Sequence, residues 1–233
     1  MPGCDDVFLA TKFFIPMDDR DPNHRGASRR WIMTEIENSL RRRGTDHVDL
    51  YQVRQPSPGT DAAETFGALT DLVRQGKTCY IGSSSYSAAQ IVEAQWVSKE
   101  NHYARFVTEQ PPYSILVRGI ETVVLPTVQR HGMGALTYSP LDGGWLSGRW
   151  RKNNAASPAS SARPSARFDM TTPANRRKLD MVEDLAHRAE QSGICLIEMA
   201  IAFAINHPSV TAAIVGPRTM QQLRSYLPAA RRR

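Results

Sequence analysis

Short apolar runs alternate along this chain with longer stretches in which apolar residues recur every three or four positions. The short runs predict buried strands, and the periodic stretches predict helices with one apolar face. We expect strands at residues 7–12, 48–53, 79–84, 106–110, 134–140 and 211–216. We expect helices at residues 28–43, 61–75, 87–98, 120–131, 175–191 and 194–206, and a last helix that opens at 218–219. This alternation predicts an α/β protein with a parallel sheet and helices outside it.

Local start and stop signals frame several of these elements. Ser28 suits the N-cap of one predicted helix, and Gly44 suits its end. Asp61 and Glu64 have the spacing of a capping box at the start of the next helix. Residues 149–175 instead combine Ser, Asn and Pro with few apolar positions, which predicts a long flexible loop.

A polar side chain stands at or just beyond the end of each predicted strand. These residues are Lys12, Arg54, Ser84, Gln110, Tyr138 and Arg218. One polar residue at a strand end is most simply a solvated turn residue, but six at successive strands favour a common site. In a (β/α) barrel such positions share one rim, where the chemistry of that fold takes place. The chain has no GxGxxG, GxxxxGK[ST] or HExxH motif.

Composition excludes several classes of partner. The net charge is +6, but the basic clusters at 41–43, 149–152 and 231–233 fall in a helix end, a loop and a tail, and Trp150 is the one aromatic residue within them. That pattern argues against nucleic-acid binding. No apolar stretch is long enough to span a bilayer, and the first residues lack the features of a signal peptide. We therefore expect neither a nucleic-acid nor a membrane partner.

The cysteines bear on location and on metals. Cys4, Cys79 and Cys195 are odd in number, lie far apart and show no CxxC spacing. Such a pattern is typical of free thiols in a reducing compartment and not of a disulfide framework or a zinc site. We expect a cytoplasmic protein that holds no metal.

Several motifs appear in an order known from one family. They are Leu9 to Phe13, Asp46 to Pro56, Ile81 to Ser84, Glu109 to Ser114, Tyr138 to Leu141, and Gly216 to Thr219 with Gln222. Over essentially its whole length the chain resembles the aldo-keto reductases. The resemblance implies one TIM-type (β/α) barrel domain over residues 1–233, which binds NADP(H) and reduces aldehydes and ketones to alcohols. A small carbonyl compound would be the substrate.

The resemblance also implies site residues. Lys12 matches the catalytic lysine, and Arg54 stands where the family has its catalytic histidine. Tyr138 would stack under the nicotinamide, Ser84 and Gln110 would hold its carboxamide, and Arg218 would bind a 2′-phosphate through charge-assisted hydrogen bonds at a helix start. The full set of expected cofactor residues is Ser84, Ser85, Gln110, Tyr138, Ser139, Leu141, Gly143, Gly216, Arg218 and Gln222.

The sequence departs from the family pattern in three ways. We count six strand–helix units where a complete barrel has eight, so we expect the first two units, with the family's aspartate and tyrosine, to be missing before Val7. An incomplete barrel has open sheet edges, which favours a homo-oligomer. Arg54 replaces a histidine and keeps its charge at working pH, while Ser85 and Tyr226 replace asparagines.

These departures leave other functions open. One alternative is a catalytically inactive NADP(H)-binding protein with a regulatory role. Another is elimination or isomerisation chemistry that uses Lys12 and Arg54.

Overall fold

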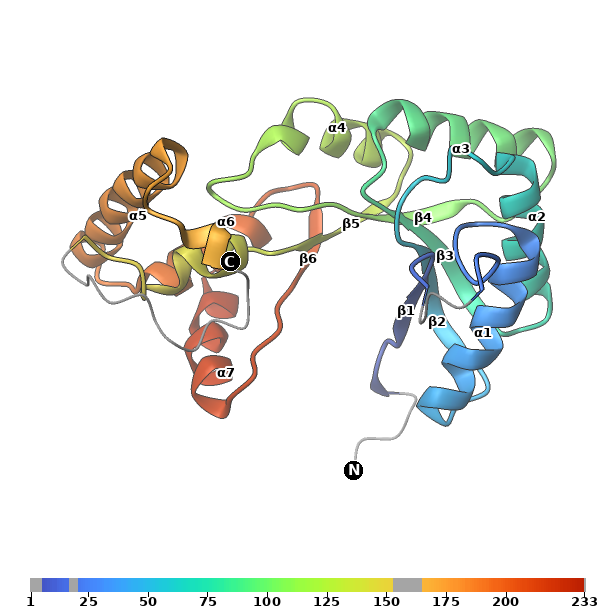
Figure 1. Cartoon of the computed structure of the whole chain (residues 1–233), viewed down its shortest axis with the longest axis horizontal. Helices are drawn as coiled ribbons and strands as arrows, with labels where there is room; N and C mark the ends of the chain where they lie inside the picture. The colour runs from blue at the N-terminus through green and yellow to red at the C-terminus, as the bar shows by residue number, and fades with distance from the viewer. Residues whose placement is uncertain (1–5, 17–20, 153–164, 233) are drawn as a thin grey trace. The chain divides into compact units, whose positions relative to one another are not determined.

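The computed structural model describes residues 6–16, 21–152 and 165–232 (Figure 1). Its strands are β1 (Ala10–Phe13), β2 (Val48–Val53), β3 (Thr78–Ser84), β4 (Phe106–Gln110), β5 (Gly134–Tyr138) and β6 (Val210–Ile214). They form one sheet in sequence order, and the pairings from β1 to β5 are parallel. The predicted α/β class with a parallel sheet is confirmed. The closed barrel stays a prediction.

The helices follow the predicted alternation. They are α1 (Arg29–Arg43), α2 (Ala62–Arg74), α3 (Ala88–Glu100), α4 (Val124–Arg130), α5 (Pro173–Gln191), α6 (Leu196–Ile205) and α7 (Met220–Tyr226). Short 3₁₀ segments lie at Gly119–Glu121, Asp142–Ser147, Ser165–Phe168 and Leu227–Arg231. Among the described residues, none of the helices combines the length and apolar character that crossing a membrane requires.

Two predicted elements begin clearly later than expected. The first strand begins at Ala10 and not at Val7. The helix expected over 120–131 is a 3₁₀ turn followed by α4, which starts at Val124. A helix from residue 120 would place Pro126 in its interior, where the ring clashes with the carbonyl four residues back. Starting at Val124 keeps this proline in the first turn.

The chain divides into two compact units. The first, here the N-terminal unit, comprises residues 1–111 and 120–136, and the second, here the C-terminal unit, comprises 112–119 and 137–233. The single domain that the resemblance implies over 1–233 stays a prediction.

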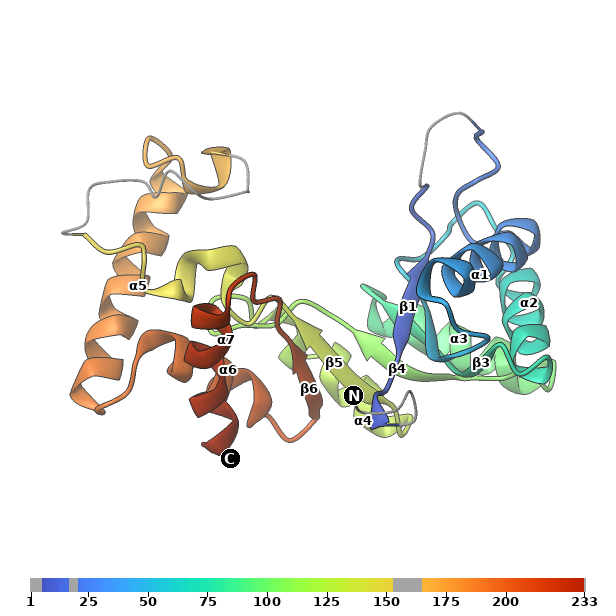
Figure 2. The same ribbon diagram turned by 90° about the horizontal axis from the view of Figure 1, so that it is seen from below.

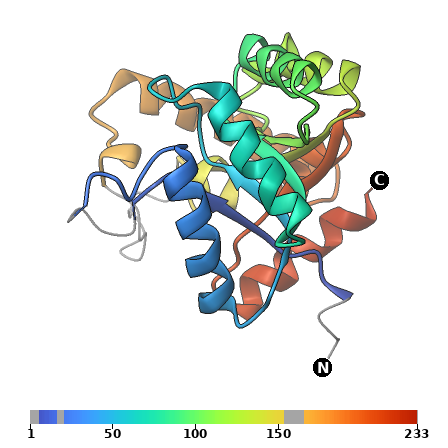
Figure 3. The same ribbon diagram turned by 90° about the vertical axis from the view of Figure 1, so that its right-hand side faces the viewer.

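Capping explains where the first helices of the N-terminal unit begin. The Ser28 hydroxyl accepts a hydrogen bond from the Trp31 amide, and Gly44 ends α1 with φ 64°, as expected. Asp61 caps α2, but Glu64 does not complete the expected capping box. Its Oε1 accepts from the Arg29 amide instead, at 2.8 Å. This bond joins the starts of α1 and α2, which run side by side (Figure 3).

Apolar side chains between the strands and these helices form the core of the N-terminal unit. The largest that are almost fully buried here are Ile32, Ile36, Leu50, Tyr51, Leu69, Leu72, Ile81, Ile91, Phe106 and Leu125. The rings of Phe66 and Phe106 pack at a centroid distance of 4.6 Å. This core fixes the strands, and therefore the positions of the residues at their carboxyl ends.

An aromatic cluster forms the core of the C-terminal unit. Trp150 stacks on Phe168 at a centroid distance of 4.2 Å, and Trp145 packs against both rings. Apolar residues of α5 and α6 complete the cluster. Figure 2 shows α6 beside β6 and α7, contacts that belong to the same unit.

The loop predicted over 149–175 is only partly described, because residues 153–164 lie outside the described ranges. Arg151 binds Glu183 and Glu190, each at 2.8 Å, and so ties the first part of the segment to α5. The second part holds the 3₁₀ turn Ser165–Phe168, and α5 begins at Pro173.

Candidate functional site

Two basic side chains lie together at the carboxyl ends of β1 and β2 in the N-terminal unit. Lys12 pairs in register with Gln52, and the Arg54 amide donates to the Phe13 carbonyl at 3.1 Å. Because side chains alternate along a strand, Lys12, Gln52 and Arg54 share one face of the sheet. Burial lowers the pKa of the Lys12 ammonium, and the Arg54 charge lowers it further.

Two carboxamides, on β2 and β4, are linked across the intervening strand β3. The Gln52 Nε2 donates to the Ser83 carbonyl at 3.3 Å, and its Oε1 accepts from the Gln110 Nε2 at 3.2 Å. A main-chain carbonyl can only accept, so this carbonyl fixes which way Gln52 points, and Gln52 then fixes Gln110. Among the described residues, none donates to the Gln110 Oε1. That oxygen remains an acceptor for a ligand.

Ser84 and Ser85 lie at the end of β3, beside β4. The Ser84 hydroxyl is buried and donates to the Gln110 carbonyl at 2.9 Å. Ser85 is exposed and adopts φ 59°, a left-handed conformation that is strained for a residue other than glycine. Backbone strain of this kind clusters at functional sites.

A buried carboxyl accepts hydrogen bonds from the residues on either side of this strained turn. Glu109 on β4 is fully buried and accepts hydrogen bonds from the Ser83 hydroxyl and, at 3.2 Å, from the Tyr86 amide. Burial raises the pKa of this carboxyl to about 7, although the bonds from Ser83, Tyr86 and Ser85 pull the pKa down. The residues that flank the Ser84–Ser85 turn are therefore hydrogen-bonded to a titratable group.

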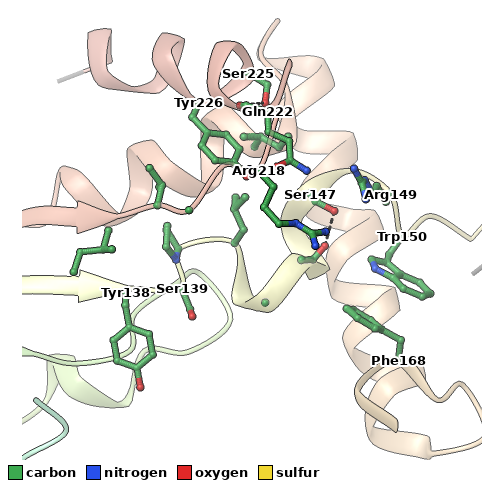
Figure 4. A pocket seen from close by; sticks show the side chains of 18 residues that line it. Tyr138, Ser139, Ser147, Arg149, Trp150, Phe168, Arg218, Gln222, Ser225 and Tyr226 are labelled. Carbon is green, nitrogen blue, oxygen red and sulfur yellow. Dashed lines mark hydrogen bonds between the residues drawn. The ribbon is translucent and has the colours of Figure 1, made fainter. Parts of the chain in front are cut away.

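The C-terminal unit contains a cavity of about 550 Å³ (Figure 4). Its lining combines hydroxyl groups, two guanidinium groups, glycines and an apolar wall. The residues are Tyr138, Ser139, Pro140, Leu141, Gly143, Gly144, Ser147, Arg149, Trp150, Phe168, Ile197, Ile214, Val215, Gly216, Arg218, Gln222, Ser225 and Tyr226.

The loop after β5 enters this cavity with an unusual backbone. Ser139 has φ 60° and Asp142 has φ 43°, and both are in the left-handed region although neither is glycine. Gly143 and Gly144 follow with φ 67° and 115°, values that glycine adopts at little cost. Lys178 on α5 binds the Asp142 carboxylate at 2.8 Å and holds the turn in place.

Two arginines reach the cavity from different elements. Figure 4 shows Arg218, which precedes α7, extending in the direction of Ser147, with Arg149 on the neighbouring strip of chain. In the described part of the chain, neither guanidinium pairs with a carboxylate. The Gln222 Oε1 accepts a hydrogen bond from the Arg218 main-chain amide at 2.7 Å and so holds the backbone from which this arginine extends. The cavity therefore presents uncompensated positive charge, a setting that suits phosphate groups.

Comparison with known proteins shows which family this sequence matches. The sequence matches the model of the Aldo/keto reductase family over residues 3–232. The chain belongs to this family.

Several curated proteins are similar to this family member. An "Uncharacterized oxidoreductase YrpG" of Bacillus subtilis (strain 168) is 37% identical over 226 residues, which cover 96% of this chain and 67% of that protein. A "Putative voltage-gated potassium channel subunit beta" of Schizosaccharomyces pombe is 31% identical over 217 residues, covering 92% and 63%. A "Probable voltage-gated potassium channel subunit beta" of Arabidopsis thaliana is 31% identical over 232 residues, covering 96% and 68%. This chain spans about two thirds of the length of these relatives.

The expected site residues of this aldo/keto reductase chain fall into two local groups. Tyr138, Ser139, Leu141, Gly143, Gly216, Arg218 and Gln222 line the cavity of the C-terminal unit. Lys12, Arg54, Ser84, Ser85 and Gln110 belong to the N-terminal unit, at the ends of β1 to β4. The catalytic and cofactor roles of all these residues stay predictions.

Sequence reasoning assigned no role to several residues of these two groups. Arg149 was overlooked because it lies in the stretch predicted to be a loop, although a guanidinium close to glycines suits phosphate contact. Gln52 and Glu109 were overlooked because they lie inside strands. A polar residue that interrupts an apolar strand is the signal that could have found both.

Proposed function

We propose that this protein binds NADP(H) and reduces aldehydes or ketones to alcohols. The observation that carries the proposal is the cavity of the C-terminal unit, where Arg149 and Arg218 lie without acidic partners beside a glycine-containing turn. Membership of the aldo/keto reductase family supports it.

The chemistry of this cavity fits the phosphate end of a dinucleotide. Guanidinium groups form paired, charge-assisted hydrogen bonds with phosphate oxygens. Gly143 and Gly144 lack side chains that would keep a pyrophosphate from the backbone. The volume of about 550 Å³ lies within the usual range of ligand pockets. α7 has only seven residues, so we assign the binding to side chains and not to a helix dipole.

The N-terminal unit, taken by itself, offers groups that suit a carboxamide and a carbonyl compound. We assign the Gln110 Oε1 and the Ser84–Ser85 turn to the carboxamide, because that group offers both donors and an acceptor. Bound NADPH would supply a hydride to the carbonyl carbon. We assign to Lys12 the proton that the oxygen takes up, since an ammonium with a lowered pKa gives up its proton more readily. A small carbonyl compound as substrate and a homo-oligomeric state remain predictions.

A calorimetric titration of the whole chain with NADPH tests the binding step. We expect saturable binding that weakens tenfold or more in Arg218→Ala, because one charge-assisted contact contributes about 1.5–3 kcal/mol. Arg224→Ala is the matched control, since this exposed arginine of α7 does not line the cavity. Absence of binding, or an equal loss in both variants, would refute the proposal.

A second candidate is an NADP(H)-binding subunit without turnover. Arg54 at the position of the family's catalytic histidine favours it, and so do the relatives described as potassium channel beta subunits. The absorbance of the reduced nicotinamide separates the two candidates. If NADPH binds and is consumed on addition of simple aldehydes or ketones, the protein is a reductase; binding without consumption supports the subunit.

A further inference from the structure

We propose that Lys12 and Arg54 together bind a carboxylate, so that the preferred substrates are carbonyl compounds that carry a carboxylate group, such as 2-oxo acids. The substrate class rests on the proposed reductase function, whereas the anion site itself does not.

The strand register brings the two cations together. Lys12 on β1 lies opposite Gln52 on β2, and Arg54 follows two residues later on the same face. The bond from the Arg54 amide to the Phe13 carbonyl, 3.1 Å long, extends the pairing to the last residue of β1. Both side chains are half-buried at the carboxyl ends of their strands. The backbone therefore holds both cations at one end of the sheet.

Their surroundings leave the two charges uncompensated. Within the described ranges, neither Lys12 nor Arg54 forms an ion pair with a carboxylate. Gln52, which lies opposite Lys12 and two residues before Arg54, is fully buried and neutral, and its carboxamide is hydrogen-bonded to Ser83 and Gln110. The lowered pKa of Lys12 reflects this setting, because both burial and the nearby Arg54 charge disfavour the ammonium.

A carboxylate is the anion that suits this pair best. The guanidinium of Arg54 is planar and can donate two parallel hydrogen bonds to the two carboxylate oxygens. Lys12 can add a third, charge-assisted bond from a different direction. A bound anion would offset the repulsion between two half-buried cations, which is stronger there than in bulk water. A neutral carbonyl compound carries no charge and would not offset this repulsion.

Calorimetric titration of the whole chain with pyruvate, pyruvamide and inorganic phosphate, without cofactor, tests the anion site. Pyruvamide has the carbonyl group and size of pyruvate but no charge. We expect pyruvate to bind tenfold or more tightly than pyruvamide, and more tightly than phosphate. Equal binding of pyruvate and pyruvamide, or binding of neither, would overturn the proposal. Tighter binding of phosphate would overturn the assignment to a carboxylate.

Three variants locate the site. Arg54→Gln and Lys12→Met should each remove most of the preference for pyruvate over pyruvamide. Arg43→Gln should keep it, because Arg43 binds the Thr11 hydroxyl, which lies on the opposite face of β1 from Lys12. Retention of the preference in both site variants, or its loss in Arg43→Gln as well, would contradict the assignment.

A parallel NADPH titration separates this inference from the function on which the substrate class depends. Pyruvate binding without NADPH binding would support the anion site and refute the reductase. NADPH binding without a preference for pyruvate would refute the anion site and leave the reductase standing.

Discussion

Glu109 allows the effect of one buried group on stability to be worked out. The pKa of this carboxyl is raised from 4.5 to about 7, chiefly by burial. As pH rises from about 4.5 to 7, the unfolded chain releases this proton while the folded protein keeps it. The folded protein is therefore destabilised over that window, and the loss is complete above pH 7. At about 1.4 kcal/mol per pKa unit, the full effect is about 3 kcal/mol.

Glu109→Gln should remove this loss without breaking the surrounding hydrogen bonds. The new amide oxygen can accept from the Tyr86 amide, and the new NH₂ group can donate to the Ser83 hydroxyl, which in turn reaches the Thr108 carbonyl at 3.3 Å. The variant carries no titrating group at this position. Its free energy of unfolding, relative to that of the wild type, should therefore rise by about 2 to 3 kcal/mol between pH 5 and pH 8.

Urea unfolding followed by circular dichroism at several pH values measures this difference. Glu100→Gln is the control, since this exposed residue at the end of α3 should show no pH-dependent difference. A difference for Glu109→Gln that stays flat, or that shrinks with rising pH, would show that Glu109 does not titrate as its burial implies.

Two further substitutions test close packing and hydrogen-bond direction in the N-terminal unit. Gly82→Ala would place its Cβ 2.2 Å from the Thr108 Oγ1, so we expect the free energy of unfolding to fall by about 1–3 kcal/mol. Adding Thr108→Ala removes the hydroxyl and should restore part of this loss. If the effects of the two substitutions simply add, the clash is not the cause. In the wild type, the Gln110 Oε1 can accept from the carboxamide of NADP⁺ but not from the carboxylate of its nicotinic acid analogue, so we expect NADP⁺ to bind about tenfold or more tightly. Gln52→Met removes the bond that fixes the Gln110 side chain, so the two affinities should become nearly equal. Gln95→Met, which also removes a donor to a main-chain carbonyl, should leave that preference intact, and an unchanged preference in Gln52→Met would contradict the role of Gln52.

Most of the architecture could be predicted from the sequence because it is encoded locally. β2 and β4 have the predicted bounds, since each is a short apolar run between clear breaks. Ser28 and Gly44 bracket α1 as expected, because a cap acts on the nearest few amides. Pro126 is also local information, and it accounts for the helix whose start differs most from the prediction.

The environment of the site residues could not be predicted in this way, because it depends on distant parts of the chain. Glu64 caps the Arg29 amide, 35 residues earlier. Gln52 and Gln110 are 58 residues apart, and Ser83 and Glu109 are 26 apart. A sequence pattern indicates that such a side chain is polar and near a strand end. Only the strand register shows which partner it meets, and therefore which of its atoms remain available for a ligand.

The central claim is that Arg218 binds the 2′-phosphate of NADP(H). The most direct test is the ratio of the dissociation constants of NADH and NADPH, measured for the wild type and for Arg218→Ala. We predict that the wild type prefers NADPH by tenfold or more, and that the variant loses most of this preference because its affinity for NADPH falls while its affinity for NADH does not. Equal affinities for the two cofactors in the wild type, or an unchanged ratio in Arg218→Ala, would contradict the account.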